Sequence, residues 1–223
     1  MARAATPPPS TKQQNGSEQR RLVAALRRLP DVGPSSDRAR RREPAVRVID
    51  CVLSLNRNYD KVVVPMLDRF EQQHPEVRSI RELQALITRY SSCNAFVEDV
   101  LDYHDADCAA TLRDVVNWLV TVGRWGLYEE QLSNLQLWAS EARPTDYQDL
   151  GIRGFGLAGF QYLRMLFGAN TTKPDVHICQ YVADFIGRRV SDVEALGLLE
   201  RAAAGAGLKL PDLDTTIWEN AAR

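Results

Sequence analysis

The sequence predicts an all-α protein, and three observations support this prediction. Apolar residues recur at intervals of three and four over most of the chain from Pro44 onward, which is the period of amphipathic helices. No stretch has the sustained alternation typical of a half-buried strand. Hydrophobic residues make up 44% and charged residues 26% of the 223 residues, as in globular proteins. The longest apolar runs, 62–66 and 119–122, fall far short of the ~20 residues of a membrane span, so we expect no membrane association.

The N-terminal part is expected to contain one short helix between irregular segments. Residues 1–16 are rich in Pro, Gln and Ser, which predicts a disordered tail. Residues 17–29 form a basic helical pattern, with Ser17 as a suitable N-cap and Pro30 as its end. The stretch 31–43 is charged and predicts a loop. We therefore treat 17–223 as one expected domain.

From Pro44 onward helix follows helix. Helical periodicity is found at 44–56, 63–75, 80–87, 112–120, 128–138, 157–167, 175–186, from 191 onward and at 211–221. Gly187 is placed to end the seventh of these helices, and Ser191 with Glu194 forms the pattern of a capping box for the next. Pro211 suits the first turn of the last helix.

Charge is distributed unevenly along the chain. Residues 1–47 hold eleven Lys and Arg against four Asp and Glu, a net charge of +7, and the remainder holds 17 against 25, a net charge of −8. A basic arm of this kind suits contact with nucleic-acid phosphates, and an Arg-rich solvated tail explains it equally well. The acidic stretch 98–108 is either a solvated loop or, with its His104, a metal site; the loop is favoured, because the ligands do not share one helical face.

The four cysteines do not have the spacing of a metal site or a disulfide framework. None of Cys51, Cys93, Cys108 and Cys179 forms a Cys-x-x-Cys pair. We therefore expect reduced thiols and a cytoplasmic location, with no zinc finger.

The most informative stretch runs from Leu150 to Gly159. Gly154, Phe155 and Gly156 form a Gly-x-Gly turn between a hydrophobic helix end and an apolar helix. Glycines permit a tight hairpin, and the N–H groups at the start of the following helix can hold a phosphate oxygen. A plain helix–helix turn remains the alternative.

Its context resembles the helix-hairpin-helix (HhH-GPD) DNA glycosylase superfamily, of the endonuclease III-like kind. The hairpin and one helix are followed by Lys173-Pro174-Asp175-Val176-His177-Ile178, where that family has its Asp and, two residues later, a His. The stretch 44–56 also resembles the family's first barrel helix. The resemblance covers about 17–223.

The resemblance implies a fold of two helical lobes with a cleft between them, and a base-excision repair N-glycosylase. Such an enzyme flips a damaged or mismatched base out of double-stranded DNA and hydrolyses the N-glycosidic bond. Asp175 is the implied catalytic residue, which activates water or stabilises the sugar cation; taken alone, it is simply a helix N-cap. Gly154, Phe155, Gly156 and Ala158 are the implied phosphate-binding hairpin.

Two departures from the family shape the expected chemistry. Ala158 stands where lyase-active members carry a Lys, which favours a monofunctional glycosylase without AP-lyase activity. No Cys follows Cys179, so no iron–sulfur cluster is expected. The resemblance does imply a monovalent cation at the hairpin carbonyls; we expect no other cofactor or metal.

Three further residues are candidates for the base gap or pocket. Asn56 aligns with the position that fills the gap left by the flipped base, although a helix C-cap is an equal alternative. Tyr59 follows it and could face DNA, and His177 is the histidine of the motif.

Two other function classes remain open. A non-catalytic DNA-structure-binding protein needs only the hairpin and a basic surface, and a helical protein-interaction module needs neither. For the leading hypothesis we expect a monomer that is associated with the nucleoid.

Overall fold

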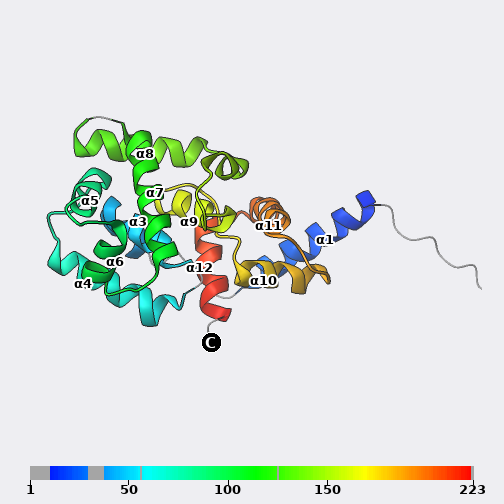
Figure 1. The fold of residues 1–223 in the computed structure, drawn as a ribbon. Helices are drawn as coiled ribbons and strands as arrows, with labels where there is room; N and C mark the ends of the chain where they lie inside the picture. The colour runs from blue at the N-terminus through cyan, green and yellow to red at the C-terminus, as the bar shows by residue number, and fades with distance from the viewer. Residues whose placement is uncertain (1–10, 30–37, 56, 125, 222–223) are drawn as a thin grey trace, which may run out of the picture. The chain divides into compact units, whose positions relative to one another are not determined.

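The computed structural model describes residues 11–29, 38–55, 57–124 and 126–221, and every regular element in these ranges is a helix (Figure 1). The predicted all-α class is thereby confirmed. None of the described helices is long and apolar enough to cross a membrane. The elements are α1 (Thr11–Leu26), α2 (Arg38–Arg41), α3 (Pro44–Leu53), the π-helix η1 (Tyr59–Val63), α4 (Val64–Gln73), α5 (Ile80–Ile87), α6 (Cys93–Leu101), α7 (Ala106–Gly123), α8 (Tyr128–Glu141), the 3-10 helix η2 (Pro144–Leu150), α9 (Leu157–Leu166), α10 (Val176–Ile186), α11 (Asp192–Ala206) and α12 (Leu210–Ala221).

The chain forms two compact units rather than the one domain expected over 17–223. The terminal unit combines Met1–Ser35 with Pro174–Arg223, and the hairpin unit is Ser36–Lys173. Each unit has its own hydrophobic core and is described by itself.

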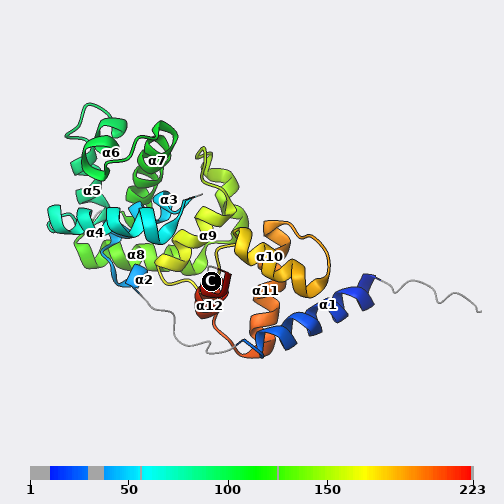
Figure 2. The same ribbon diagram turned by 90° about the horizontal axis from the view of Figure 1, so that it is seen from below.

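The hairpin unit is built around α3, which lies among α4, α7 and α9 (Figure 2). Nine of the ten residues of α3 are buried, because apolar side chains occupy more than one of its faces. On α9 the fully buried ring of Phe160 packs against the indoles of Trp118 and Trp138, with centroids 6.2 and 5.8 Å away. This aromatic cluster fixes the helix that follows the Gly-x-Gly turn.

The terminal unit packs the basic helix α1 against α10 and α11 (Figure 1). Leu22 and Leu26 enter its core. Part of the basic character of α1 is used inside the unit, since Arg21 Nη2 donates to the carbonyl of Ile186 at 2.9 Å. The buried carboxylate of Glu18 accepts from both Nε and Nη2 of Arg188 at 3.0 Å.

Several N-terminal and acidic elements differ from the expectation. Helix α1 begins at Thr11, so residues 11–16 of the expected tail are helical and Ser17 lies inside the helix instead of capping it. The expected loop at 31–43 contains the short helix α2. Helix α6 covers part of the acidic stretch that was expected to be a loop, because Val100 and Leu101 continue its buried apolar face into that stretch.

The helix ends follow the sequence signals, with one change. Gly187 ends α10 in a left-handed conformation, φ 82°, and Pro211 lies in the first turn of α12, as predicted. Ser191 Oγ accepts from Glu194 N at 3.2 Å, which is half of the predicted capping box. The other half is missing because the Glu194 carboxylate binds Arg188 Nη2 at 2.5 Å instead.

Replacing Phe160 by Ala is expected to lower the free energy of unfolding of the hairpin unit by about 3–5 kcal/mol, because a fully buried ring leaves a cavity between two indoles. Urea denaturation followed by tryptophan fluorescence measures the change. Phe185→Ala in the terminal unit is the control, since that side chain is 41% exposed. A loss of less than about 1 kcal/mol for Phe160→Ala, a typical value for an average substitution, would contradict the packing.

Candidate functional site

The Gly-x-Gly turn connects η2 to α9 within the hairpin unit. The first helix of the motif is thus a short 3-10 helix, and Gly151 ends it in a left-handed conformation, φ 61°. The turn closes with a hydrogen bond from Phe155 N to Ile152 O at 3.2 Å, and the buried Phe155 ring points into the core. The turn is therefore anchored by an apolar side chain while the glycines on both sides of Phe155 stay exposed.

Gly154 is required by both conformation and space. Its φ of 79° is unfavourable for other residues, and a Cβ would lie 3.0 Å from Thr111 Oγ1. That hydroxyl is 2.9 Å from the carbonyl oxygen of Arg153, so the turn contacts α7 closely. Gly156, in contrast, has a φ of −87° and open space where a Cβ would be.

The first turn of α9 has backbone donors without partners among the described residues, and Leu157 itself is buried. Gly156 is the N-cap and has no capping side chain, and within the described part of the chain the N–H groups of Leu157 and Ala158 have no acceptor. The Arg153 side chain, in the same turn, is 89% exposed, and its Nη2 lies 3.7 Å from Asp107 Oδ1. A helix N-terminus with open donors and a nearby cation can bind a phosphate oxygen.

Asp175 is the N-cap of α10 in the terminal unit. Its Oδ1 accepts from His177 N at 3.0 Å and from Ile178 N at 3.2 Å. No described residue donates to Oδ2, and the side chain is only half-buried. The N-cap reading is thus confirmed, and one carboxylate oxygen remains available for a ligand.

The other predicted site residues fall in different places. The hairpin and Tyr59 lie in the hairpin unit, whereas Asp175 and His177 lie in the terminal unit. His177 is half-buried in the first turn of α10. Asn56 lies outside the described residues.

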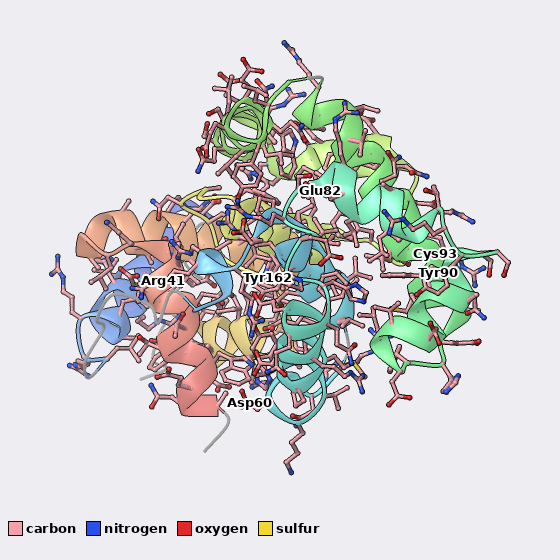
Figure 3. All side chains as sticks on the ribbon, turned by 90° about the vertical axis from the view of Figure 1, so that its left-hand side faces the viewer. Arg41, Asp60, Glu82, Tyr90, Cys93 and Tyr162 are labelled. Carbon is pink, nitrogen blue, oxygen red and sulfur yellow. The ribbon has the colours of Figure 1, made fainter. Side chains whose placement is uncertain are left out.

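Tyr59 does not simply face outward, because its hydroxyl donates to a buried carboxylate. Tyr59 begins η1 and bonds Asp50 Oδ2 at 2.9 Å. The second oxygen, Oδ1, accepts from the hydroxyl of Tyr162 at 3.0 Å. Tyr162 lies in the interior of the unit, whereas Asp60, next to Tyr59, lies at its edge (Figure 3).

The sequence analysis missed Asp50, although a signal was present. Asp50 is four residues after Val46 and three before Leu53, so it shares the face of α3 that these apolar residues define. The side chain is fully buried, and burial raises the pKa of its carboxyl to about 6. The two tyrosine hydroxyls, Arg42 and Lys173 oppose this shift but do not cancel it.

Lys173 caps the carboxyl end of α3. Its Nζ is 3.3 Å from Ser54 O and 4.7 Å from the centroid of the Tyr162 ring. A cation near the last carbonyls of a helix is favourable, and so is its contact with an aromatic face. Lys173, Tyr162, Tyr59 and Asp50 form one group, which we call the Asp50 cluster.

The acidic stretch 98–108 contributes structural contacts. Asp105 Oδ1 caps α7 through Cys108 N at 2.9 Å, and its Oδ2 binds Arg57 Nη2 at 2.8 Å. The Arg57 guanidinium also stacks on the Tyr103 ring at 4.6 Å. Among the described residues, no three His, Cys, Asp or Glu side chains are grouped so that they could hold a metal ion.

Comparison with known proteins gives one match. A family described as a domain of unknown function (DUF8548) matches residues 148–222, a segment that contains both the Gly-x-Gly turn and Asp175. No curated protein matches the chain. No solved structure matches it either.

Replacing Gly154 by Ala is expected to lower the free energy of unfolding by about 1–2 kcal/mol, because the new Cβ meets Thr111 Oγ1 and the left-handed backbone is strained. Gly156→Ala in the same turn meets no atom and is the matched control. Urea denaturation of both variants tests the difference. Equal effects would show that the turn does not have this geometry.

Replacing Asp50 by Asn is expected to change how stability depends on pH. Because the folded-state pKa of about 6 lies above the ordinary value of 3.8 for an aspartate, protonation of Asp50 favours the folded state. This contribution is complete below pH 3.8 and is lost as the pH rises through 6, about 3 kcal/mol in all. The free energy of unfolding of wild type relative to Asp50→Asn, measured in urea at pH 4 to 7, should fall accordingly. A difference that is constant with pH would contradict the shift.

Proposed function

We propose that the protein is a monofunctional DNA N-glycosylase of base-excision repair. The observation that carries the proposal is Asp175, a helix N-cap carboxylate with one oxygen bound to two amides and the other open. The position of Asp175 after a Gly-x-Gly hairpin and one helix resembles the helix-hairpin-helix glycosylases. The proposed fold is theirs, with two helical lobes and a cleft for DNA.

The proposed reaction needs a carboxylate that is fixed in place yet accessible. Water adds to C1′ of the deoxyribose and loses a proton, the N-glycosidic bond breaks, and the base leaves with its bonding electron pair and takes up a proton. An oxocarbenium-like sugar cation develops, which a nearby carboxylate stabilises. Both hydrogen bonds from backbone amides are accepted by Oδ1 of Asp175. They hold the side chain in place and leave Oδ2 for the water or the sugar cation.

The hairpin supplies the proposed DNA anchor. The N–H groups of Leu157 and Ala158, which have no acceptor among the described residues, and the exposed Arg153 are the proposed partners of a phosphate oxygen, which is bound without reading sequence. The carbonyls of Ile152 and Arg153 already accept hydrogen bonds, but each oxygen has a second lone pair and fits a monovalent cation. Such an ion would add positive charge beside the phosphate.

The chain's lysines favour hydrolysis over lyase chemistry. Ala158 cannot form a Schiff base, and the nearby Lys173 is engaged with Ser54 and the Tyr162 ring in the hairpin unit. We therefore propose water as the nucleophile, without an iron–sulfur cluster. The proposed setting is a monomer acting on double-stranded DNA in the cytoplasm, at the nucleoid.

A strand-scission assay tests the proposal. Purified protein is incubated with duplexes that carry uracil, alkylated purines, oxidised bases or mismatches, and products are analysed with and without hot alkali. We expect cleavage of one class only after alkali. Asp175→Asn should lower the rate about a hundredfold or more while keeping the fold, because Asn is an equally good N-cap.

The controls separate catalysis from folding and binding. Asp192→Asn removes another acid from the first turn of a helix in the same unit and should leave the rate unchanged. Scission without alkali would show lyase activity and refute the assignment of water as the nucleophile. No cleavage of any substrate, with salt-dependent DNA binding retained, would replace the proposal by a non-catalytic DNA-structure-binding protein.

A further inference from the structure

The Asp50 cluster contains a buried acid that the proposed reaction does not use. Asp50 has no exposed surface, and both of its oxygens accept hydrogen bonds from neutral hydroxyls. Among the described residues it forms no ion pair. A buried carboxylate with this environment is costly when it is ionised.

The nearby cations are committed to other partners. Arg42, which precedes α3, binds Asp68 at 2.7 Å and Glu71 at 2.5 Å, both on α4. Lys173, which follows α9, donates to Ser54 O. The neighbouring thiol of Cys51 donates to Gly159 O at 3.3 Å, and burial raises its pKa, so it adds no charge. Tyr59 of η1 and Tyr162 of α9 complete the groups that face Asp50.

The two hydroxyl partners differ in their exposure. Tyr162 is buried on α9, whereas Tyr59 is half-exposed on η1. Helix η1 is a single π-helical turn, closed by Val64 N donating to Tyr59 O and capped by Asn58 Oδ1 at 2.9 Å from Lys61 N. Single π-turns occur frequently at functional sites. Val63, at the other end of η1, is fully buried, so displacement of the Tyr59 end alone would bring water to Asp50.

We propose that Asp50 is a positioning residue for Tyr59: its neutral carboxyl group keeps the Tyr59 end of η1 hydrogen-bonded to α3, and its ionisation favours release of that end. The physical reason is linkage, because the ionised form gains hydration when the site opens and the neutral form does not. The part of the inference that concerns DNA rests on the proposed function, in which Tyr59 belongs to the base pocket. The coupling of Asp50 to η1 is a property of the protein without DNA and does not depend on the proposed function.

Hydrogen–deuterium exchange of the full chain tests this coupling without DNA. Protection factors of the peptide amides in 57–63, corrected for the intrinsic exchange rate at each pH, should fall by up to about tenfold from pH 5 to pH 7. Asp50→Asn has no ionisable group and should stay protected at both pH values. Asp60→Asn, which removes the exposed neighbouring acid, should behave like wild type.

A second variant keeps the test decisive if Asp50→Asn does not fold. Tyr59→Phe removes a hydrogen bond that lowers the Asp50 pKa, so the midpoint of the pH dependence should move to higher pH. A purely structural role of the tyrosine would change protection equally at all pH values. A midpoint that does not move, or the same pH dependence in Asp50→Asn as in wild type, would overturn the inference.

The role in the reaction is tested by the pH profile of single-turnover base excision. The rate should rise with a midpoint near the pH at which 57–63 lose protection, and Asp50→Asn should abolish this inflection. Exchange that follows Asp50 with no excision of any base would refute the proposed function but support the coupling. Excision with an inflection that persists in Asp50→Asn would refute the role of Asp50 and leave the proposed function intact.

Discussion

The burial of α3 is the constraint on which the hairpin unit depends. Because solvent reaches almost none of this helix, its polar groups must find partners on the elements packed around it. Asp50 accepts hydrogen bonds from a tyrosine hydroxyl of η1 and from another of α9. The Cys51 thiol donates a hydrogen bond to a backbone carbonyl of α9. The same contacts that satisfy these groups also fix where η1 and α9 lie. Local polar chemistry and packing therefore specify one arrangement.

The close approach of α3 and α9 transmits this constraint to the hairpin. A Cβ at Gly159 would lie 3.0 Å from the Phe155 ring and 3.2 Å from Leu55, so glycine at this position favours the close packing of α9 against the turn and the segment after α3. The Phe155 ring therefore packs into the core next to Gly159, while the backbone of Gly154 and Gly156 continues the turn on either side of Phe155. The amides at the start of α9 are positioned by the buried Phe155 ring and by the hydrogen bond from Thr111 Oγ1 to Arg153 O.

Helices and their ends could be predicted because their signals are local. Periodicity located α3 and α7, and Gly187 and Pro211 marked boundaries within one turn. The failures come from partners that are distant in sequence. Asp50 and Tyr162, which are hydrogen-bonded, are 112 positions apart. The Glu194 carboxylate pairs with Arg188 instead of completing the expected capping box, and Arg188 also pairs with Glu18. A single sequence contains these residues but not their pairing. Asp175 was predictable as an N-cap because its two amide donors are only two and three residues later in the sequence.

Two carboxylates of the chain, Asp175 and Asp50, have opposite surroundings and different proposed roles. Asp175 is half-exposed and retains an oxygen without a donor, so it can contact water or a sugar directly. Asp50 is enclosed and both of its oxygens are occupied, so it reaches any ligand only through Tyr59. Asp175 is fixed by backbone amides of its own helix, and Asp50 is fixed by tyrosine side chains of two other elements. The proposal therefore assigns the chemistry to Asp175, which a ligand can reach, and positioning to Asp50, which acts through Tyr59.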